Sequence, residues 1–196
     1  MSASEYDQSL YLPEYEKDAC GIGLIAQLKS EKSSDIVLDA LTMLENMEHR
    51  GACGCEENTG DGAGILTQIP HDLFRQYALD HGYQLPDAGG YAVGFLFLPK
   101  DTDLNEEILN ILDQILEQNY FKLLFIREVP VDNSMIGASA LATEPNMVQL
   151  FVQPIQHGVI RKDLERRLYV LRNHLVRNVV RSFPFLKEVF YFASFS

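Results

Sequence analysis

Cysteine is scarce in this sequence, with three residues among 196. Two of them, Cys53 and Cys55, are separated by one glycine and lie too close for an easy disulfide, so the pattern fits a reducing compartment. No apolar run approaches the ~20 residues that a membrane-spanning helix needs. Residues 1–19 hold five acids against one lysine and contain no apolar segment, which excludes a signal peptide and an arginine-rich transit peptide. We therefore expect a cytoplasmic protein without a membrane anchor.

Positive charge is also scarce. Lys and Arg number 16 against 28 Asp and Glu, and the formal net charge of −12 argues against nucleic acid as a partner. Residues 161–196 are the exception, because they hold eight basic residues and three acidic ones. Most of these basic residues lie on one expected helix, whose face either binds phosphate or, as we favour, is solvated or docks on an acidic neighbour. The basic residues are Arg161, Lys162, Arg166, Arg167, Arg172, Arg177, Arg181 and Lys187.

Apolar residues, in contrast, make up 46% of the chain, enough for one domain with a sizeable core. Helical spacing of these residues predicts four helices, at residues 34–47, 73–81, 104–118 and 163–180. The N-cap of the first is Ser34 or Asp35, and that of the third is Asp103. Short apolar runs predict strands at residues 21–28, 65–69, 91–98, 121–129, 147–153 and 189–196. Strands interleaved with helices indicate a layered α/β or α+β domain.

The last predicted strand is of the kind found inside a sheet. A strand of this type without a following turn invites edge pairing and aggregation. We interpret its place at the end of the sequence as a sign that the domain is cut short.

Cys20 opens the segment Cys20-Gly21-Ile22-Gly23, directly after the acidic leader. A thiol is a weak nucleophile at neutral pH until a base takes its proton. None of the five histidines has the spacing of a triad partner, so a nucleophilic Cys20 needs its own base. A free α-amino group, with a pKa of about 7.7–8.0, supplies that base if cleavage after Ala19 makes Cys20 the first residue. The alternative, from this segment alone, is a buried structural cysteine.

Two later blocks favour the nucleophile. The first contains Leu44-Glu45-Asn46-Met47 and His49-Arg50-Gly51-Ala52, and the second contains Glu57-Asn58 and Thr59-Gly60-Asp61-Gly62-Ala63-Gly64. Further matching segments are Ile136-Gly137, Gln149 with Phe151-Val152, and Phe190-Tyr191 with Ser194 and Ser196. Together with the cysteine start, these blocks resemble the large subunit of the glutamate synthase family along the whole chain after residue 19.

The resemblance implies a class II glutamine amidotransferase domain. Its fold would be α+β, the N-terminal-nucleophile hydrolase four-layer αββα sandwich, incomplete in this chain. Residues 1–19 would be a propeptide and residues 20–196 the N-terminal part of the domain. In this family the exposed cysteine, here Cys20, attacks the γ-carbonyl of L-glutamine, releases ammonia and forms a thioester that water cleaves to glutamate. The ammonia serves glutamate biosynthesis from 2-oxoglutarate.

The resemblance also suggests two substrate-binding residues. Arg50 matches the arginine of the family's His-Arg-Gly block, which lies near the nucleophile, although an arginine before glycine is also typical of a helix C-terminus. Asp61 either shapes the loop of the site or is an ordinary turn residue between glycines.

Two other interpretations of the same region are weaker. The glycines at 60, 62 and 64 precede a predicted strand and not a helix, which is the wrong context for a phosphate-binding loop. His49, Cys53 and Cys55 are three candidate metal ligands without a fourth partner nearby. We interpret the two cysteines as small packing residues and expect no metal in this chain.

The family builds its oxyanion hole from an Asn-Gly pair, and the sequence contains no Asn-Gly dipeptide. Loss of even one oxyanion donor costs roughly 10²–10³ in rate, so we expect residues 1–196 to be inactive alone. The alternatives are an active stand-alone glutaminase and a non-catalytic scaffold or interaction module that retains the fold. The FMN and the iron–sulfur cluster of the parent enzyme are expected on other domains. Expected partners are the remaining glutamate synthase domains and a small subunit or ferredoxin, with the electron donor, NADPH or ferredoxin, left open.

Overall fold

The computed structural model describes residues 21–29, 31–47, 56, 59–60, 62–156 and 161–196. The chain divides into two compact units. The first unit contains the described residues up to Leu66 together with Met135–Ala140, and the second contains Thr67–Ser134 and Leu141–Ser196. None of the described helices combines the length and the apolar character that a membrane crossing requires.

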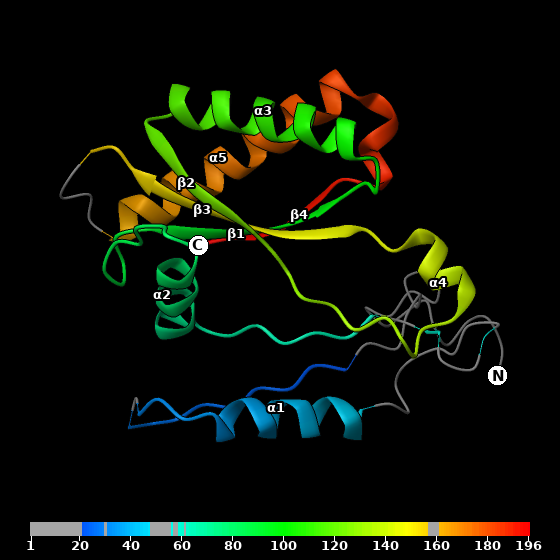
Figure 1. Ribbon diagram of the computed structural model, residues 1–196. Helices are drawn as coiled ribbons and strands as arrows, with labels where there is room; N and C mark the ends of the chain where they lie inside the picture. Colours follow the sequence, from blue (N-terminus) through cyan, green and yellow to red (C-terminus); the bar gives the residue numbers. More distant parts are fainter. Residues whose placement is uncertain (1–20, 30, 48–55, 57–58, 61, 157–160) are drawn as a thin grey trace, which may run out of the picture. The chain divides into compact units, whose positions relative to one another are not determined.

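A four-stranded antiparallel sheet forms the centre of the second unit, in the order β2-β3-β1-β4 (Figure 1). Its strands are β1 (Ala92–Leu98), β2 (Phe121–Glu128), β3 (Asn146–Pro154) and β4 (Tyr191–Phe195). Valine, leucine and phenylalanine are frequent in these strands, as suits a pleated surface that packs against other layers. Strand β1, one of the two central strands, is almost continuously buried. This burial explains why its sequence is an almost unbroken apolar run.

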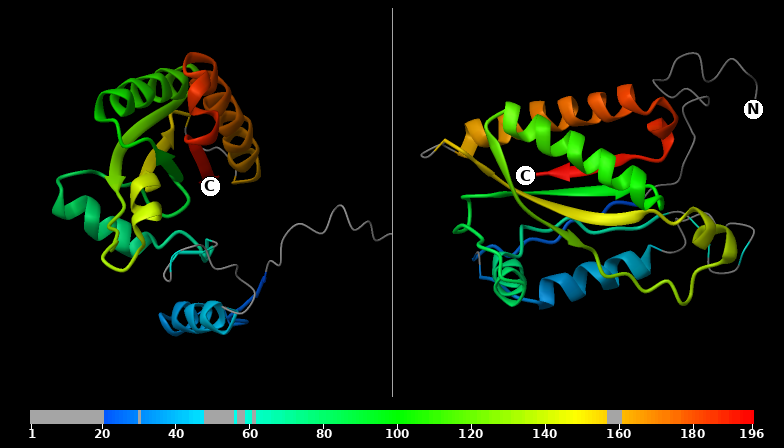
Figure 2. Two further views of the ribbon diagram at one scale, coloured as in Figure 1. Left: turned by 90° about the vertical axis from the view of Figure 1, so that its right-hand side faces the viewer. Right: turned by 45° about the horizontal axis from the view of Figure 1, so that its top comes forward.

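Two helices, α3 (Thr102–Gln118) and α5 (Arg161–Ser182), cover one face of this sheet (Figure 2). Their apolar residues recur at three- and four-residue spacing, which gives each helix one apolar stripe. Leu112 of α3 and Leu168 of α5 are fully buried in one cluster with Leu96 of β1. This cluster is the main core of the second unit.

A third helix, α2 (His71–Asp80), lies on the opposite face of the sheet (Figure 1). The ring of Phe74 meets the ring of Phe151 edge-on at 4.8 Å between centroids, and Phe125 stacks on Phe151 at 4.3 Å. These rings form a second, smaller cluster. The second unit therefore has helices on both faces of its sheet.

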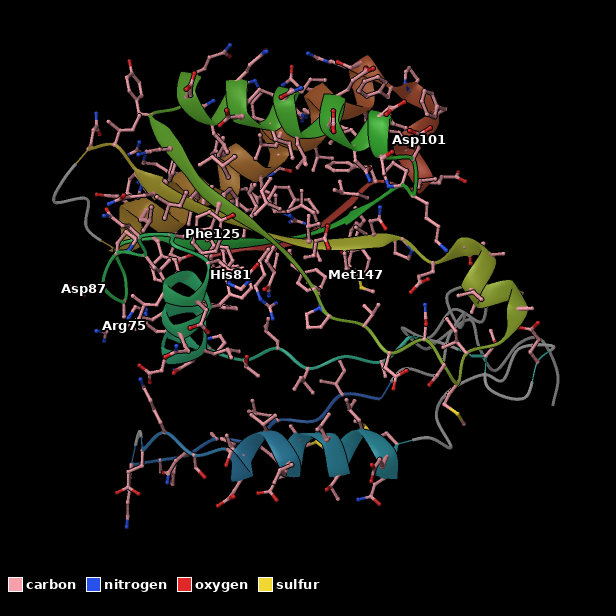
Figure 3. The ribbon with its side chains drawn as sticks, in the orientation of Figure 1. Arg75, His81, Asp87, Asp101, Phe125 and Met147 are labelled. Carbon is pink, nitrogen blue, oxygen red and sulfur yellow. The ribbon has the colours of Figure 1, made fainter. Side chains whose placement is uncertain are left out.

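The N-terminus of α3 is capped by Asp101, which lies where the helix begins (Figure 3). The Asp101 carboxylate accepts a hydrogen bond from the backbone N–H of Leu104 at 3.0 Å. The prediction of Asp103 as the cap is wrong, because Asp103 already lies in the first turn of the helix. Both aspartates precede the apolar stripe, so residue type alone does not separate them.

The sequence predicted the helices and strands between residue 71 and the last residue with shifts of a few positions, and these predictions are confirmed. The short helix α4 (Ala138–Thr143) and the 3₁₀ helix η4 (Pro184–Glu188) were not predicted. In the described sheet, the last predicted strand is β4, an edge strand beside β1. The α+β character of the prediction is confirmed.

The basic residues of α5 divide between packing and solvent. Arg172 donates a hydrogen bond from Nε to the carbonyl oxygen of Phe192 at 2.7 Å. The Arg167 guanidinium lies 5.1 Å from the centroid of the Phe121 ring. Arg166 is exposed, so the prediction of a solvated face holds for part of the set.

The first unit contains the helix α1 (Asp35–Asn46), which confirms the prediction for residues 34–47. Ser34 is the N-cap residue, but its side chain makes no capping hydrogen bond. Instead, the hydroxyl of Ser33 accepts a hydrogen bond from the Asp35 N–H at 3.0 Å. No residue of α1 is buried, and Leu38 is 58% exposed.

The strands predicted at residues 21–28 and 65–69 are wrong, because neither segment is part of a sheet. Ile22 is 95% exposed and Leu66 is 92% exposed. A strand needs a hydrogen-bonded neighbour as well as an apolar sequence, and neither segment pairs with one. An apolar run alone does not reveal this difference.

Candidate functional site

The three predicted site residues, Cys20, Arg50 and Asp61, lie outside the described residues. His49, Cys53 and Cys55, which were considered as metal ligands and interpreted without a metal, lie outside them as well. The structure therefore tests none of these assignments, and they stay predictions. The structure does describe residues near these positions, namely 21–29, 31–47, 56, 59–60 and 62–66. These residues belong to the first unit.

The centre of the described neighbourhood is the carboxylate of Glu56. The Ser139 hydroxyl donates a hydrogen bond to Glu56 Oε2 at 2.7 Å. The backbone N–H of Ser139 lies 3.1 Å from Oε1 and 3.2 Å from Oε2, and the Thr59 hydroxyl donates to Oε2 at 3.0 Å. Glu56 thus joins two segments that are 83 residues apart in the sequence.

These hydrogen bonds favour the ionised form of the carboxylate. They hold the pKa of Glu56 below its ordinary value, with the Ser139 hydroxyl as the largest cause, followed by the Ser139 N–H and the Thr59 hydroxyl. Partial burial acts in the opposite direction and is outweighed. Glu56 is consequently an acceptor for all three donors at neutral pH.

A glycine allows the close approach of the two segments. A Cβ atom on Gly137 would collide with the Glu56 carboxylate and with the Thr59 hydroxyl. A larger residue at position 137 would therefore displace the Glu56 carboxylate and the Thr59 hydroxyl from these positions. Gly137 belongs to the Ile-Gly pair that matched the glutamate synthase family, so the structure gives this pair a packing reason.

The segment that follows Cys20 packs against α1. A Cβ atom on Gly23 would overlap the side chain of Met43, which is half-buried. The glycine of the Cys-Gly-Ile-Gly start is thus used for close packing beside the helix. Met43 is a flexible side chain, so the clash at Gly23, like the one at Gly137, involves side-chain atoms that can move.

A further polar pair lies in the second unit, at the start of α2. The Nδ1 atom of His71 lies 3.1 Å from the hydroxyl oxygen of Tyr91. Burial raises the pKa of Tyr91 to about 12, and the negative charge of Asp72 adds to the shift. Tyr91 therefore keeps its proton across the physiological range and ties the start of β1 to α2.

In the part of the chain that the structure describes, no group of three His, Cys, Asp or Glu side chains is arranged to hold a metal ion. The Glu56 contact was not among the predicted site features. Glu56 directly precedes the Glu57-Asn58 pair of the second block, and Ser139 follows the Ile136-Gly137 pair by two positions. These neighbouring motifs were the signal in the sequence that could have pointed to the Glu56–Ser139 contact. The two residues are 83 positions apart, so no local sequence spacing predicts that they meet.

Comparison with known proteins places these features in a family. Residues 20–196 match the family model described as glutamine amidotransferases class-II. The chain is 40% identical to ferredoxin-dependent glutamate synthase 2, chloroplastic, of Arabidopsis thaliana over 92% of its own length. It is 39% identical to the glutamate synthase [NADPH] large chain of Bacillus subtilis over 84% of its length, and 38% identical to the glutamate synthase [NADH] of Schizosaccharomyces pombe over 86%. The chain spans only 8–11% of the length of these relatives. Because the family match extends over most of its residues, the chain belongs to the class II glutamine amidotransferases.

Proposed function

We propose that this chain is the glutamine-hydrolysing part of a glutamate synthase, with Cys20 as its N-terminal nucleophile after removal of residues 1–19. The observation that carries the proposal is that the family match begins at Cys20. The names of the relatives, which are glutamate synthases using ferredoxin, NADH or NADPH, support the wider role. The ammonia released is then used in making glutamate from 2-oxoglutarate.

In the proposed reaction, the free α-amino group of Cys20 takes the proton of its thiol. The thiolate sulfur attacks the γ-carbonyl carbon of glutamine, and the same amine returns the proton to the leaving nitrogen. Ammonia departs when the C–N bond breaks, which leaves a thioester on Cys20. Water then attacks the thioester and the C–S bond breaks. Glutamate is released, and the thiol of Cys20 is regenerated.

Arg50 and Asp61 are proposed to bind glutamine beside Cys20. Arg50 supplies a fixed positive charge with several N–H donors, which suits the carboxylate of an amino-acid substrate. Asp61 lies between two glycines, so its loop passes close to the substrate without bulky side chains. The described glycines at 62 and 64 have open space where a Cβ would lie, which supports an accessible loop here.

The proposed fold is the four-layer αββα sandwich of N-terminal-nucleophile hydrolases. The second unit supports it with one αβ half, in which α3 and α5 cover one face of the antiparallel sheet. On the other face, Phe95 and Phe97 of β1 are only half-buried, which leaves them able to pack against a further layer.

Two features of this chain argue against its holding the redox cofactors of a glutamate synthase. An iron–sulfur cluster of the usual type needs four cysteine ligands, and the sequence has three cysteines. Residues 62–69 form no helix, so the glycines do not form the loop-to-helix phosphate site that FMN favours. We therefore propose that FMN and the iron–sulfur cluster belong to other domains, with a small subunit or ferredoxin as a further partner.

The proposal is tested with a diazoketone analogue of glutamine on the protein at its natural full length. We expect intact mass to lack residues 1–19 and peptide mapping to find one adduct, on Cys20. Cys20→Ala should abolish both the processing and the adduct. The matched control is Cys53→Ala, which removes another cysteine of the chain and should leave the labelling of Cys20 unchanged.

Equal labelling of the wild type and Cys20→Ala would show that Cys20 is not the nucleophile. A chain that keeps residues 1–19 and takes up no analogue would instead favour the alternative, a non-catalytic scaffold or interaction module that retains the fold. The same experiment thus separates the enzyme from the scaffold. A cytoplasmic location stays a prediction, because some relatives are named as chloroplastic enzymes.

A further inference from the structure

The contact between Glu56 and residues 137–139 has the features of a fixed junction. Ser139 contributes two donors and Thr59 one, and all of them converge on a single carboxylate. Hydrogen bonds to an ionised acceptor are roughly twice as strong as those between neutral groups. The close approach at Gly137 adds a steric requirement to this polar one.

The junction connects two of the sequence blocks that carry the family resemblance. Thr59 begins the Thr-Gly-Asp-Gly block, two positions before Asp61. On the other side, Gly137 and Ser139 belong to a segment that no expectation from the sequence placed at the site. Glu56 itself is neither in a helix nor in a strand, so its partners and not its secondary structure set its position.

We infer that Glu56 is a positioning residue for glutamine binding, which holds Thr59, at the start of the Thr-Gly-Asp-Gly block, near residues 137–139. This inference rests on the proposed function, since it needs Cys20 and Asp61 to form the glutamine site. Glu56 acts through the loop and does not touch the substrate. Removing its carboxylate frees Thr59 to shift, and a shift of about 1 Å passed on to a binding group costs up to roughly 100-fold.

The test compares wild type, Glu56→Ala and Ser139→Ala in the full-length protein, with the diazoketone analogue as the probe. The concentration dependence of labelling separates the apparent affinity for the analogue from the rate of attack by the thiol. We expect Glu56→Ala to weaken the affinity roughly 10- to 100-fold with the attack rate little changed. Ser139→Ala removes the hydroxyl and keeps the N–H donor, so its effect should be smaller and in the same direction.

Two controls distinguish positioning from a general loss of structure. Alkylation of Cys20 by iodoacetamide does not require glutamine recognition, so its rate should be equal in wild type and Glu56→Ala. Glu56→Gln keeps one acceptor oxygen and should recover part of the affinity. Glu31→Ala, which changes an exposed glutamate of the same unit, should label as the wild type does.

The outcomes separate the two proposals. If the wild type labels Cys20 and Glu56→Ala labels with the same affinity, the positioning role is wrong and the proposed function stands. If Glu56→Ala fails to fold, Ser139→Ala decides in the same way, with unchanged affinity overturning the inference. A wild type that takes up no analogue overturns the proposed function and the inference with it.

Discussion

The two units hold their side chains in place by different means. In the second unit, α3 and α5 bury leucines against the sheet until Leu112 and Leu168 have no exposed surface. In the first unit, α1 buries none of its residues. Thr59 and Ser139 are held by their hydrogen bonds to Glu56, next to the close approach at Gly137. Among the described residues, the first unit is thus held by polar contacts at Thr59 and Ser139, and the second unit by an apolar core.

The difference has a consequence for stability. Apolar burial contributes about 25 cal/mol per Å² and is not directional, whereas the few Glu56 hydrogen bonds are directional and compete with water. Regions with few buried contacts open locally at low free energy. We therefore expect the second unit to set the global stability and the described parts of the first unit to open locally at lower free energy.

The largest effect that tests this comparison comes from the core. Leu168→Ala deletes a fully buried side chain and leaves a cavity between α5 and the sheet. Such substitutions cost about 2–5 kcal/mol, measured as the change in the free energy of unfolding in urea. Leu38→Ala on α1, where the leucine is 58% exposed, should change it by no more than about 0.5 kcal/mol. Similar losses for both variants would break the comparison, because α1 would then belong to the cooperative core.

A smaller effect is expected from a polar contact inside the second unit. Asp101→Ala removes the acceptor for the Leu104 N–H at the start of α3. Loss of such a cap typically costs about 1 kcal/mol, measured by the shift of the urea midpoint. Asp103→Ala is the matched control, since Asp103 lies two residues later, in the first turn, and only contributes charge near the helix N-terminus. A larger loss for Asp103→Ala would contradict the assignment of the cap.

The sequence predicted the second unit far better than the first. Helices such as α3 and strands such as β1 can be predicted from their apolar pattern, because their buried apolar residues pack against partners within this unit. The segment at residues 21–28 has the same apolar composition, but it forms no ladder, and sequence patterns record composition and not partners. The motif blocks identified the family, whereas the Glu56–Ser139 contact joins residues far apart in the chain and follows no local period. Long-range polar contacts of this kind need the fold before they can be recognised.

The smallest expected effects come from the titration of single side chains, Glu56 in the first unit and Tyr91 in the second. We expect the first unit to respond at acidic pH and the second at alkaline pH. The pKa of Glu56 lies below its ordinary value of 4.5. Its contribution is therefore present above that value and is lost as the pH falls through the lower folded-state value. The pKa of Tyr91 is raised from 10.0 to about 12, so its contribution is present below pH 10 and is lost as the pH rises towards 12. The protection factor of the Ser139 amide, which corrects for the slower intrinsic exchange in acid, should fall as the pH drops. The free energy of unfolding should fall in alkali. Tyr91→Phe should reduce the alkaline loss and leave the acid response of Ser139 unchanged, because the tyrosine belongs to the core of the second unit and the Glu56 junction to the first. A Tyr91→Phe protein that loses its acid response would show that the two units do not titrate separately.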